Sequence, residues 1–360
     1  MTITHEARWV LDSAQKGISS LHYEESTGVI DPPLGAEDVL VEIHAVSLNY
    51  RDIAIAKGTS NAITLPIPPG GIIPASDGAG TVLSIGSAVA ASAPEFKTGT
   101  KVITHMVPYL ADAQMPGFAD IAAGLGQGIN GTLCRRGVFH YSSLVPFAGK
   151  LTFEEAATLT CSGLTAWNAV MGFPGREVKK GDWVLVQGTG GVSLAALQIA
   201  VSAGANVIAT TSSDAKMERL LALGASHALN YKTEPNWGVE AKKLTPDARG
   251  VDHVVDVGGT GTLPQSLEAV REQGLITVAG GVAGYGEGGP AAMSALFRLC
   301  VFRGVLLGSR DMLRDAVTWF EEKGIKPALD DVVFELEDAV KGFERLERQE
   351  HFSKVVVKIR

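Results

Sequence analysis

"GDWVLVQGTGGVSLAALQIA", residues 181–200, places an apolar strand, a glycine-rich turn and an apolar helix in direct succession. Within it, GTGGVS (188–193) follows the strand and opens the helix, which is the context that a dinucleotide fingerprint requires. Gly188 allows the tight turn, and Gly190 lets the backbone approach a pyrophosphate held at the helix N-terminus. We therefore expect this turn to bind a dinucleotide through Gly188, Thr189, Gly190, Gly191 and Val192.

The third glycine of the fingerprint is replaced by Ser193. A hydroxymethyl group is the smallest polar substitute, so the interpretation stands. A second stretch, GYGEGG at 284–289, matches the bare glycine pattern completely. We interpret it as a glycine-rich loop, because the pattern without a strand before it and a helix after it is a weak signal.

The same strand and helix pattern repeats along the following residues. NVIATT (206–211) precedes a helix that runs to Leu223, and VDHVVDV (251–257) and LITVAGG (275–281) flank another helix. Strands this uniformly apolar are covered on both faces, which is typical of parallel strands with helices on either side. The sequence therefore predicts a doubly wound, Rossmann-type α/β domain in this part of the chain.

Residues 1 to about 160 have a different character. Short alternating segments are separated by proline- and glycine-rich turns such as DPPLG and LPIPPGG, which favours a barrel-like β-domain. Residues 39–44 alternate between apolar and polar and predict a strand with one packed face, which closes in VSLNYRD (46–52). Two interpretations of the polar residues at its end stay open: a solvated strand terminus, or part of a site.

Length and composition limit the possible functions. A chain of 360 residues exceeds what one hydrophobic core usually serves, so two domains are expected. The net charge of −8 provides no basic surface for nucleic acid or an anionic membrane. The first residues lack a leader pattern, and no run of about 20 apolar residues occurs. The three cysteines are widely spaced, so no disulfide framework is expected. We expect a soluble, cytoplasmic protein that acts on a small molecule.

The residues after the second Rossmann-type strand bear on the choice of cofactor. An NAD-binding domain normally ends this strand with an acid that accepts from the ribose 2′-hydroxyl, whereas here it ends TTSSDAK. Ser212, Ser213 and Lys216 suit the 2′-phosphate of NADP(H), and Asp214 stands where aspartate caps a helix. The alternative is an ordinary Ser-Asp helix cap with a solvated lysine.

The chain resembles the medium-chain dehydrogenase/reductase superfamily, and within it the zinc-independent quinone oxidoreductase-like branch. The resemblance runs the length of the chain and rests on segments that include NYRD (49–52), PASDGAGTVLSIG (74–86), EEAATLTCSGLTAWNAV (154–170), GVDHVVDVGGTGTL (250–263) and HFSKVVVKI (351–359). It implies a GroES-like β-barrel catalytic domain, residues 1–162 and 306–360, and a Rossmann NADP(H)-binding domain, residues 163–305. It also implies a cofactor cleft between the domains and a homodimer joined through the Rossmann sheets.

The resemblance further implies which residues form the sites. Zinc-dependent relatives have a cysteine at the position of Asn49, a His-Glu pair at Ser76 and Asp77, and a cysteine at Cys161, which alone remains here. We therefore expect no metal. Asn49 and Tyr50 are the implied catalytic residues, with the Tyr50 phenol as proton donor, although a tyrosine that merely packs is equally open. Further implied cofactor positions are Thr165, Tyr231, Gly258, Gly280, Val282 and Phe352.

The leading hypothesis is an NADPH-dependent oxidoreductase that reduces quinones or activated, α,β-unsaturated carbonyl compounds by hydride transfer. A zinc-free NAD(P)-dependent alcohol dehydrogenase or carbonyl reductase is an alternative within the same superfamily, because one fold serves both reactions. A non-catalytic NADPH-binding protein is an alternative of a different class. The physiological substrate is not encoded in any motif that we identify.

Overall fold

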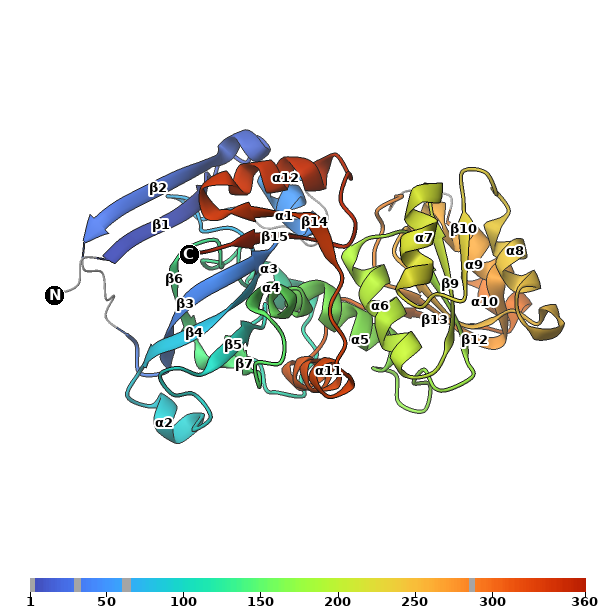
Figure 1. Ribbon diagram of the computed structural model, residues 1–360, viewed down its shortest axis with the longest axis horizontal. Helices are drawn as coiled ribbons and strands as arrows, with labels where there is room; N and C mark the ends of the chain where they lie inside the picture. Colours follow the sequence, from blue (N-terminus) through green and yellow to red (C-terminus); the bar gives the residue numbers. More distant parts are fainter. Residues whose placement is uncertain (1–3, 29–33, 60–65, 285–288) are drawn as a thin grey trace. The chain divides into compact units, whose positions relative to one another are not determined.

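The computed structural model describes residues 4–28, 34–59, 66–284 and 289–360. The chain divides into two compact units, Met1–Ser162 with Ser309–Arg360, and Gly163–Gly308 (Figure 1). The second boundary lies three residues beyond the predicted 305/306, because Val305 donates to the Val278 carbonyl and the Leu307 carbonyl accepts from Asn168. These bonds hold residues 305–307 in the second unit, which we call the Rossmann unit; the first is the barrel unit.

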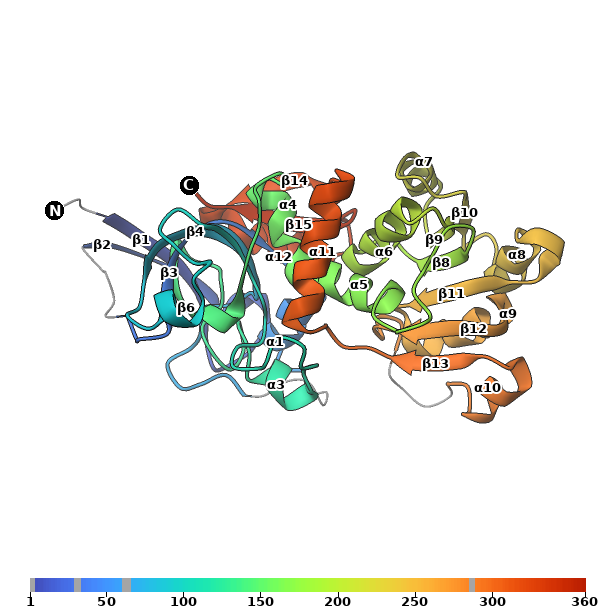
Figure 2. The ribbon, with the colours of Figure 1, turned by 90° about the horizontal axis from the view of Figure 1, so that it is seen from below.

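The Rossmann unit contains a six-stranded sheet in the order β10-β9-β8-β11-β12-β13. Every neighbouring pair is parallel, which confirms the predicted doubly wound sheet. This is the strand order of dinucleotide-binding Rossmann domains. Figure 2 shows the strands side by side, with β13 at one edge. Their bounds are β8 Trp183–Gln187, β9 Asn206–Thr211, β10 His227–Asn230, β11 Val251–Asp256, β12 Val270–Val278 and β13 Val301–Gly304.

Helices connect these strands and cover the sheet. The strand interiors are almost wholly buried, and Leu185, Ile208 and Val254 lie in one core cluster with Trp237 of α8. This explains the uniformly apolar strands of the sequence. The helices are α5 Leu164–Val170, α6 Gly191–Ser202, α7 Asp214–Ala222, α8 Trp237–Lys243, α9 Leu263–Ala269 and α10 Met293–Arg298, with short 3-10 turns at Pro246–Ala248 and Gly259–Gly261.

The barrel unit contains a largely antiparallel sheet in the order β14-β15-β3-β4-β5-β7, with β6 also paired to β3. Strand β15, the C-terminal segment of the chain, pairs with β3, so the last residues return to the first unit. A two-stranded ribbon, β1 with β2, accompanies the sheet. The bounds are β1 Thr4–Leu11, β2 Leu21–Gly28, β3 Asp38–Ser47, β4 Asp77–Ile85, β5 Lys101–Thr104, β6 Arg136–His140, β7 Leu144–Pro146, β14 Leu329–Glu335 and β15 Lys354–Lys358.

Short helices lie between the strands of the barrel unit, and α12 packs on β14 and β15 (Figure 1). Residues 159–163 form one π-helical turn, Leu159–Gly163, which runs directly into α5. Among the described residues, no helix combines the length and hydropathy needed to cross a membrane. The α-helices are α1 Tyr50–Ala56, α2 Val89–Ser92, α3 Phe118–Ala122, α4 Phe153–Ala157, α11 Arg310–Lys323 and α12 Ala339–Glu347, with 3-10 turns at Ile18–Ser20, Tyr141–Ser143 and Leu336–Asp338.

Strand β3 differs from the predicted strand with one packed face. Leu40, expected on the solvent face, is 4% exposed, and residues 45–47 are all buried. Two register shifts occur against β4, and the second, between Ile43 and Ala45, leaves His44 as an extra residue of β3, so that the alternation is interrupted there. The strand also ends at Ser47, so Asn49 and Tyr50 begin helix α1 rather than closing the strand.

Candidate active site

The glycine turn of the Rossmann unit has the geometry that its sequence predicts. Gly188 directly follows β8 and has φ +75°, a conformation that favours glycine. A Cβ atom added at Gly190 would meet no atom within 4 Å, so the backbone is open to a close approach at the N-terminus of α6. Ser193 is buried and donates its hydroxyl to the Gln187 carbonyl at 2.6 Å. The serine therefore joins helix to strand where a glycine would allow close packing.

Several other predicted cofactor positions lie at the same edge of the sheet. Ser212 follows β9, Tyr231 follows β10, Gly258 follows β11, and Gly280 and Val282 follow β12. The carboxyl ends of parallel strands meet at one edge, where α/β proteins of this class bind their ligands. The Tyr231 and Val282 side chains are exposed, and an added Cβ at Gly280 would come within 2.9 Å of the Val257 carbonyl oxygen.

The segment after β9 corrects one prediction. Asp214 does not cap α7: its Oδ1 accepts from the Asn230 Nδ2 at 2.7 Å, which ties α7 to the end of β10. Ser213 takes the N-cap position without a side-chain bond, and Lys216 lies half-buried in the first turn. The hydroxyls predicted to face a 2′-phosphate are thus not used as helix caps, and no carboxylate from β9 stands among them.

Two predicted cofactor positions lie elsewhere. Thr165 is buried on α5 of the Rossmann unit, and Phe352 is buried just before β15 of the barrel unit, with its N–H donating to Asp330 Oδ1 at 3.0 Å. The loop GYGEGG falls mostly on residues 285–288, which lie outside the described residues. Its interpretation therefore stays a prediction.

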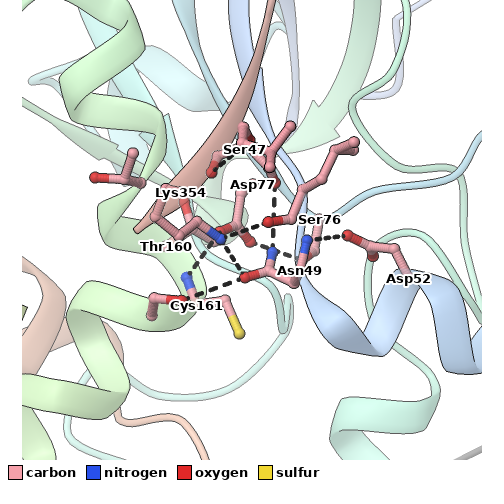
Figure 3. Close-up of polar contacts among 12 residues, drawn as sticks. Ser47, Asn49, Asp52, Ser76, Asp77, Thr160, Cys161 and Lys354 are labelled. Atoms are coloured by element: carbon pink, nitrogen blue, oxygen red, sulfur yellow. Dashed lines mark hydrogen bonds and ion pairs between the residues drawn. The ribbon is translucent and has the colours of Figure 1, made fainter. Parts of the chain in front are cut away.

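The barrel unit brings the four positions of the resembled zinc site together (Figure 3). Ser76 donates to Asp77 Oδ1 at 2.8 Å, and the Cys161 N–H donates to Asp77 Oδ2 at 3.2 Å. Ser162, the next residue of the π-helical turn, donates to Asn49 Oδ1 at 3.4 Å. Asn49 and Asp77 are both buried, whereas Cys161 is partly exposed, so the cluster is a polar network with one accessible side.

Sequence reasoning missed Lys354, which joins this cluster from β15. Its ammonium donates to the Leu48 carbonyl at 2.8 Å and to Asn49 Oδ1 at 2.5 Å, and it lies 3.7 Å from Asp77 Oδ2 (Figure 3). The residue is only 5% exposed. The only local signal is that this lysine opens the apolar strand KVVVKI, and a lysine at a strand end is usually solvated.

Tyr50 lies next to this cluster in sequence but has a different environment. It is the first residue of α1 and is 53% exposed. Its neighbour Arg51 donates to the Leu125 carbonyl at 3.2 Å and to Gln127 Oε1 at 3.4 Å. The NYRD segment therefore combines a buried amide, an accessible phenol, an anchored guanidinium and a buried carboxylate, and the solvated-terminus interpretation fails for all but the tyrosine.

Asp52 is the buried carboxylate of that segment. Its Oδ2 accepts from the Asn49 N–H at 2.7 Å, whereas its Oδ1 has no hydrogen-bond partner. Burial raises the pKa of Asp52 to about 6 from the ordinary 3.8, against the opposing effect of Arg51. The folded protein therefore binds a proton that the unfolded chain releases between these two values, and stability falls as pH rises through this interval.

We expect Asp52→Asn to remove the loss of stability that the wild type shows as the pH rises. The amide oxygen can still accept from Asn49, and a neutral side chain avoids the desolvation of the carboxylate. Urea unfolding of both proteins should diverge from about pH 4 to pH 6, with the variant more stable by up to about 2.5 kcal/mol at pH 7. Asp247→Asn, at an exposed aspartate, is the control. Parallel pH profiles for wild type and Asp52→Asn would contradict the prediction.

Comparison with known proteins covers both units. Residues 35–149 match the family model described as the alcohol dehydrogenase GroES-like domain, and residues 191–322 match that described as zinc-binding dehydrogenase. A zinc-type alcohol dehydrogenase-like protein of Schizosaccharomyces pombe is 38% identical over 98% of this chain and 99% of its own length. The chain belongs to the medium-chain dehydrogenase/reductase superfamily. It is therefore a member of an oxidoreductase family that binds nicotinamide cofactors.

Other members of the superfamily that are similar to this chain differ in their described activities. The quinone oxidoreductase of Rattus norvegicus is 28% identical over 70% of this chain and 67% of its own length. A solved structure of an NAD-dependent alcohol dehydrogenase is 32% identical, with a TM-score of 0.83 over 98% of this chain and all of that one. The comparisons thus establish the family and the fold. The substrate class has to be inferred from the residues of the site.

These residues do not fit the zinc ion that the family description names. A catalytic zinc needs three protein ligands of the thiolate, imidazole or carboxylate type. No group of three or more His, Cys, Asp or Glu residues suited to a metal occurs in the described ranges. Burial, with the Asp77 carboxylate, raises the pKa of Cys161 to about 12, so its thiol is protonated at neutral pH. The Lys354 ammonium is already within 3.7 Å of Asp77, where a second cation would be repelled.

Proposed function

We propose that this dehydrogenase/reductase is a zinc-independent, NADPH-dependent reductase of quinones or of α,β-unsaturated carbonyl compounds. The observation that carries the proposal is the cluster of Asn49, Ser76 and Lys354, an amide, a hydroxyl and an ammonium at the resembled metal position. Without a metal, a simple ketone is polarised poorly. A conjugated substrate spreads the incoming negative charge before a proton arrives, so it depends less on a Lewis acid.

In this proposal the Rossmann unit binds the cofactor, and the barrel unit provides the residues that act on the substrate. The nicotinamide cofactor supplies a hydride when bound, and the turn at 188–192 would hold its pyrophosphate. In the barrel unit, Tyr50 would donate a proton to the substrate oxygen that becomes negative, because its side chain is accessible and carries an O–H donor. Asn49, held in place by its hydrogen bonds, would orient that oxygen. We expect this chemistry to take place in the cytoplasm.

The decisive experiment measures NADPH oxidation by the purified protein with a panel of quinones, enones and aldehydes, and NADP⁺ reduction with alcohols. Turnover should be fastest with quinones or enones and should persist in a chelator, with no stoichiometric zinc by elemental analysis. Alcohol oxidation that persists in a chelator would instead establish the zinc-free alcohol dehydrogenase alternative. Alcohol oxidation that is lost together with one zinc per chain would establish a zinc-dependent alcohol dehydrogenase, which the description of the Schizosaccharomyces pombe relative favours. Cofactor binding without turnover on any substrate would favour the non-catalytic alternative.

The preference for NADPH rests on the segment after β9. Ser212, Ser213 and Lys216 are partly exposed there, and the carboxylate of Asp214 is engaged by Asn230. A 2′-phosphate would find hydroxyl donors and the Lys216 ammonium there, while the Asp214 carboxylate is held toward Asn230. NADH lacks that phosphate, so the same groups would contribute little to its binding.

Lys216→Ala should therefore weaken NADPH binding by about 1.5 to 3 kcal/mol, the usual scale for a hydrogen bond to a charged group. NADH binding should change little. Fluorescence titration of both cofactors measures the difference, with Lys180→Ala, an exposed lysine before β8, as the matched control. Equal losses for NADPH and NADH would mean that Lys216 has a structural role only.

We also propose that the protein is a homodimer joined at the β13 edge of the Rossmann sheet. In the part of the chain that the structure describes, β13 pairs with β12 alone, so its other edge is open. The neighbouring helix α10 exposes Met293, Leu296 and Phe297, the last by 79%. An open strand edge beside exposed apolar side chains favours pairing with a second chain.

Phe297→Glu should convert the dimer into a monomer, because it places a charge in the apolar part of this surface. Light scattering coupled to size-exclusion chromatography measures the mass directly. Phe118→Glu, at an exposed phenylalanine of the barrel unit, is the matched control and should remain dimeric. A wild-type protein that elutes as a monomer at micromolar concentration would rule the interface out.

A further inference from the structure

Lys354 belongs to the cluster that supports the proposed function, but no chemical role has been assigned to it, and its environment is unusual. A lysine side chain is seldom this deeply buried, and here it is 5% exposed beside a carboxylate, Asp77, that is wholly buried. Its ammonium contacts two neutral oxygens, the Leu48 carbonyl and Asn49 Oδ1, as well as Asp77 Oδ2 (Figure 3). The charge is thus fixed by three segments of the barrel unit, β15, the end of β3 and the start of β4.

Packing alone does not account for this arrangement. Removing an ammonium and a carboxylate from water costs several kcal/mol each, and an apolar pair of similar size is often as stable or more stable. The remaining Asp77 contacts come from Ser76 and the Cys161 N–H, so the carboxylate has partners besides the lysine. A buried charge that adds little net stability indicates a use for the charge itself.

The contacts of Asn49 show where that charge acts. Its Oδ1 accepts from both Lys354 and Ser162, while its Nδ2 makes one long bond, 3.4 Å, to the Ser47 carbonyl. An amide group has two Nδ2 hydrogens, so one remains for another acceptor. A cation on the amide oxygen draws electron density from the nitrogen and strengthens each N–H as a donor. Lys354 therefore both orients the amide and activates its free N–H.

We propose that Lys354 is a fixed cation that takes the place of a metal ion in this barrel and acts on the substrate oxygen through Asn49. It is a positioning residue, because two of its donors are used by protein oxygens and its charge is paired with buried Asp77. The part that concerns the substrate rests on the proposed reductase function. The part that concerns the metal position does not, since a fixed ammonium excludes a dication whether or not the protein turns over a substrate.

A double-mutant cycle tests the action through Asn49. Asn49→Ala should lower kcat on the best enone or quinone by about 10²-fold, the lower end for loss of one oxyanion donor. Lys354→Met should lower kcat by about tenfold with KM for the substrate and Kd for NADPH unchanged, because it weakens a donor without removing it. The double variant should be no slower than Asn49→Ala. Additive losses would show that Lys354 does not act through Asn49 and would overturn this part.

Lys354→Met leaves Asp77 without its counter-ion, so the cycle is repeated in the Asp77→Asn background, where both charges are gone. Circular dichroism and the Kd for NADPH verify that each variant is folded. Wild-type turnover in a folded Lys354→Met/Asp77→Asn protein would overturn the proposal. Asp77→Asn alone, which keeps the ammonium, should retain more activity than the variant that has lost the charge.

Zinc binding tests the metal position without any activity assay. Asn49→Cys with Ser76→His adds two ligands beside Cys161. With Lys354 intact, this variant should remain free of zinc after incubation and desalting, as judged by elemental analysis. With Lys354→Met added, it should retain about one zinc per chain. Zinc in both variants, or in neither, overturns the proposal. If the wild type reduces nothing in the substrate panel, the reductase function fails while this result still decides the role of the fixed cation.

Discussion

Tyr50→Phe is expected to lower turnover of an enone or quinone by about 10²-fold or more while NADPH binding stays normal. A positioned general acid contributes on this scale, and the substitution removes only the hydroxyl. Tyr50 begins α1 directly after Asn49, and its side chain is half-exposed, so the phenol is accessible to a substrate. Steady-state kinetics give kcat and KM, and fluorescence titration gives the cofactor Kd.

The comparison variant is Tyr109→Phe, which removes the hydroxyl of another exposed tyrosine of the barrel unit and should leave the rate unchanged. Solvent isotope effects add a second readout, since loss of the proton donor makes protonation slower than hydride transfer. Near-wild-type rates for Tyr50→Phe on an enone would mean that Tyr50 only packs. The proton would then come from water or from the cofactor ribose, and Asn49 alone would contact the oxygen.

The fold could be predicted from the sequence because its signals are local. The largely apolar strands at 183–187 and 275–278 and the glycine turn at 188–193 can each be recognised within a short stretch of sequence, and together they predict parallel strands covered on both faces. The strand pairing of the barrel unit was harder to predict from the sequence. Its register shifts in β3 depend on the pairing with β4, a partner some forty residues away, so no pattern within residues 38–47 reveals them.

The site was predictable only where a position could be matched by resemblance. Asn49, Ser76, Asp77 and Cys161 were grouped correctly, because a family motif carries each of them. Lys354 was missed, since its partners come from β3 and β4 and a lysine in a terminal strand is usually solvated. The π-helical turn at 159–163, which aims Cys161 and Ser162 into the cluster, has no composition signal of its own.

A second missed residue, Asp256, holds together the edge of the Rossmann sheet where the predicted cofactor positions lie. Its Oδ1 accepts from the Gly258 and Gly259 N–H groups and from Thr262, and its Oδ2 accepts from Gln187 and Ser266. The carboxylate is wholly buried at the end of β11. Five donors from β8, α9 and the turn after β11 thus converge on one side chain, which fixes the turn that carries Gly258.

Asp256→Ala should lower the free energy of unfolding of the Rossmann unit by about 4 kcal/mol. Each buried donor left without an acceptor costs about 1 to 3 kcal/mol, and water entering the space can satisfy only some of the five. NADPH binding should weaken as well, because the turn after β11 loses its anchor. Urea unfolding followed by tryptophan fluorescence measures the stability, with Glu218→Ala, an exposed acid on α7, as the control for loss of a negative charge.

Asp256→Asn keeps one acceptor oxygen but turns its amide group toward donors. The free energy of unfolding of this variant should therefore lie between those of the wild type and the alanine variant. A loss below about 1 kcal/mol for the alanine variant would show that water replaces the carboxylate fully, and the edge would then be held by its backbone bonds alone.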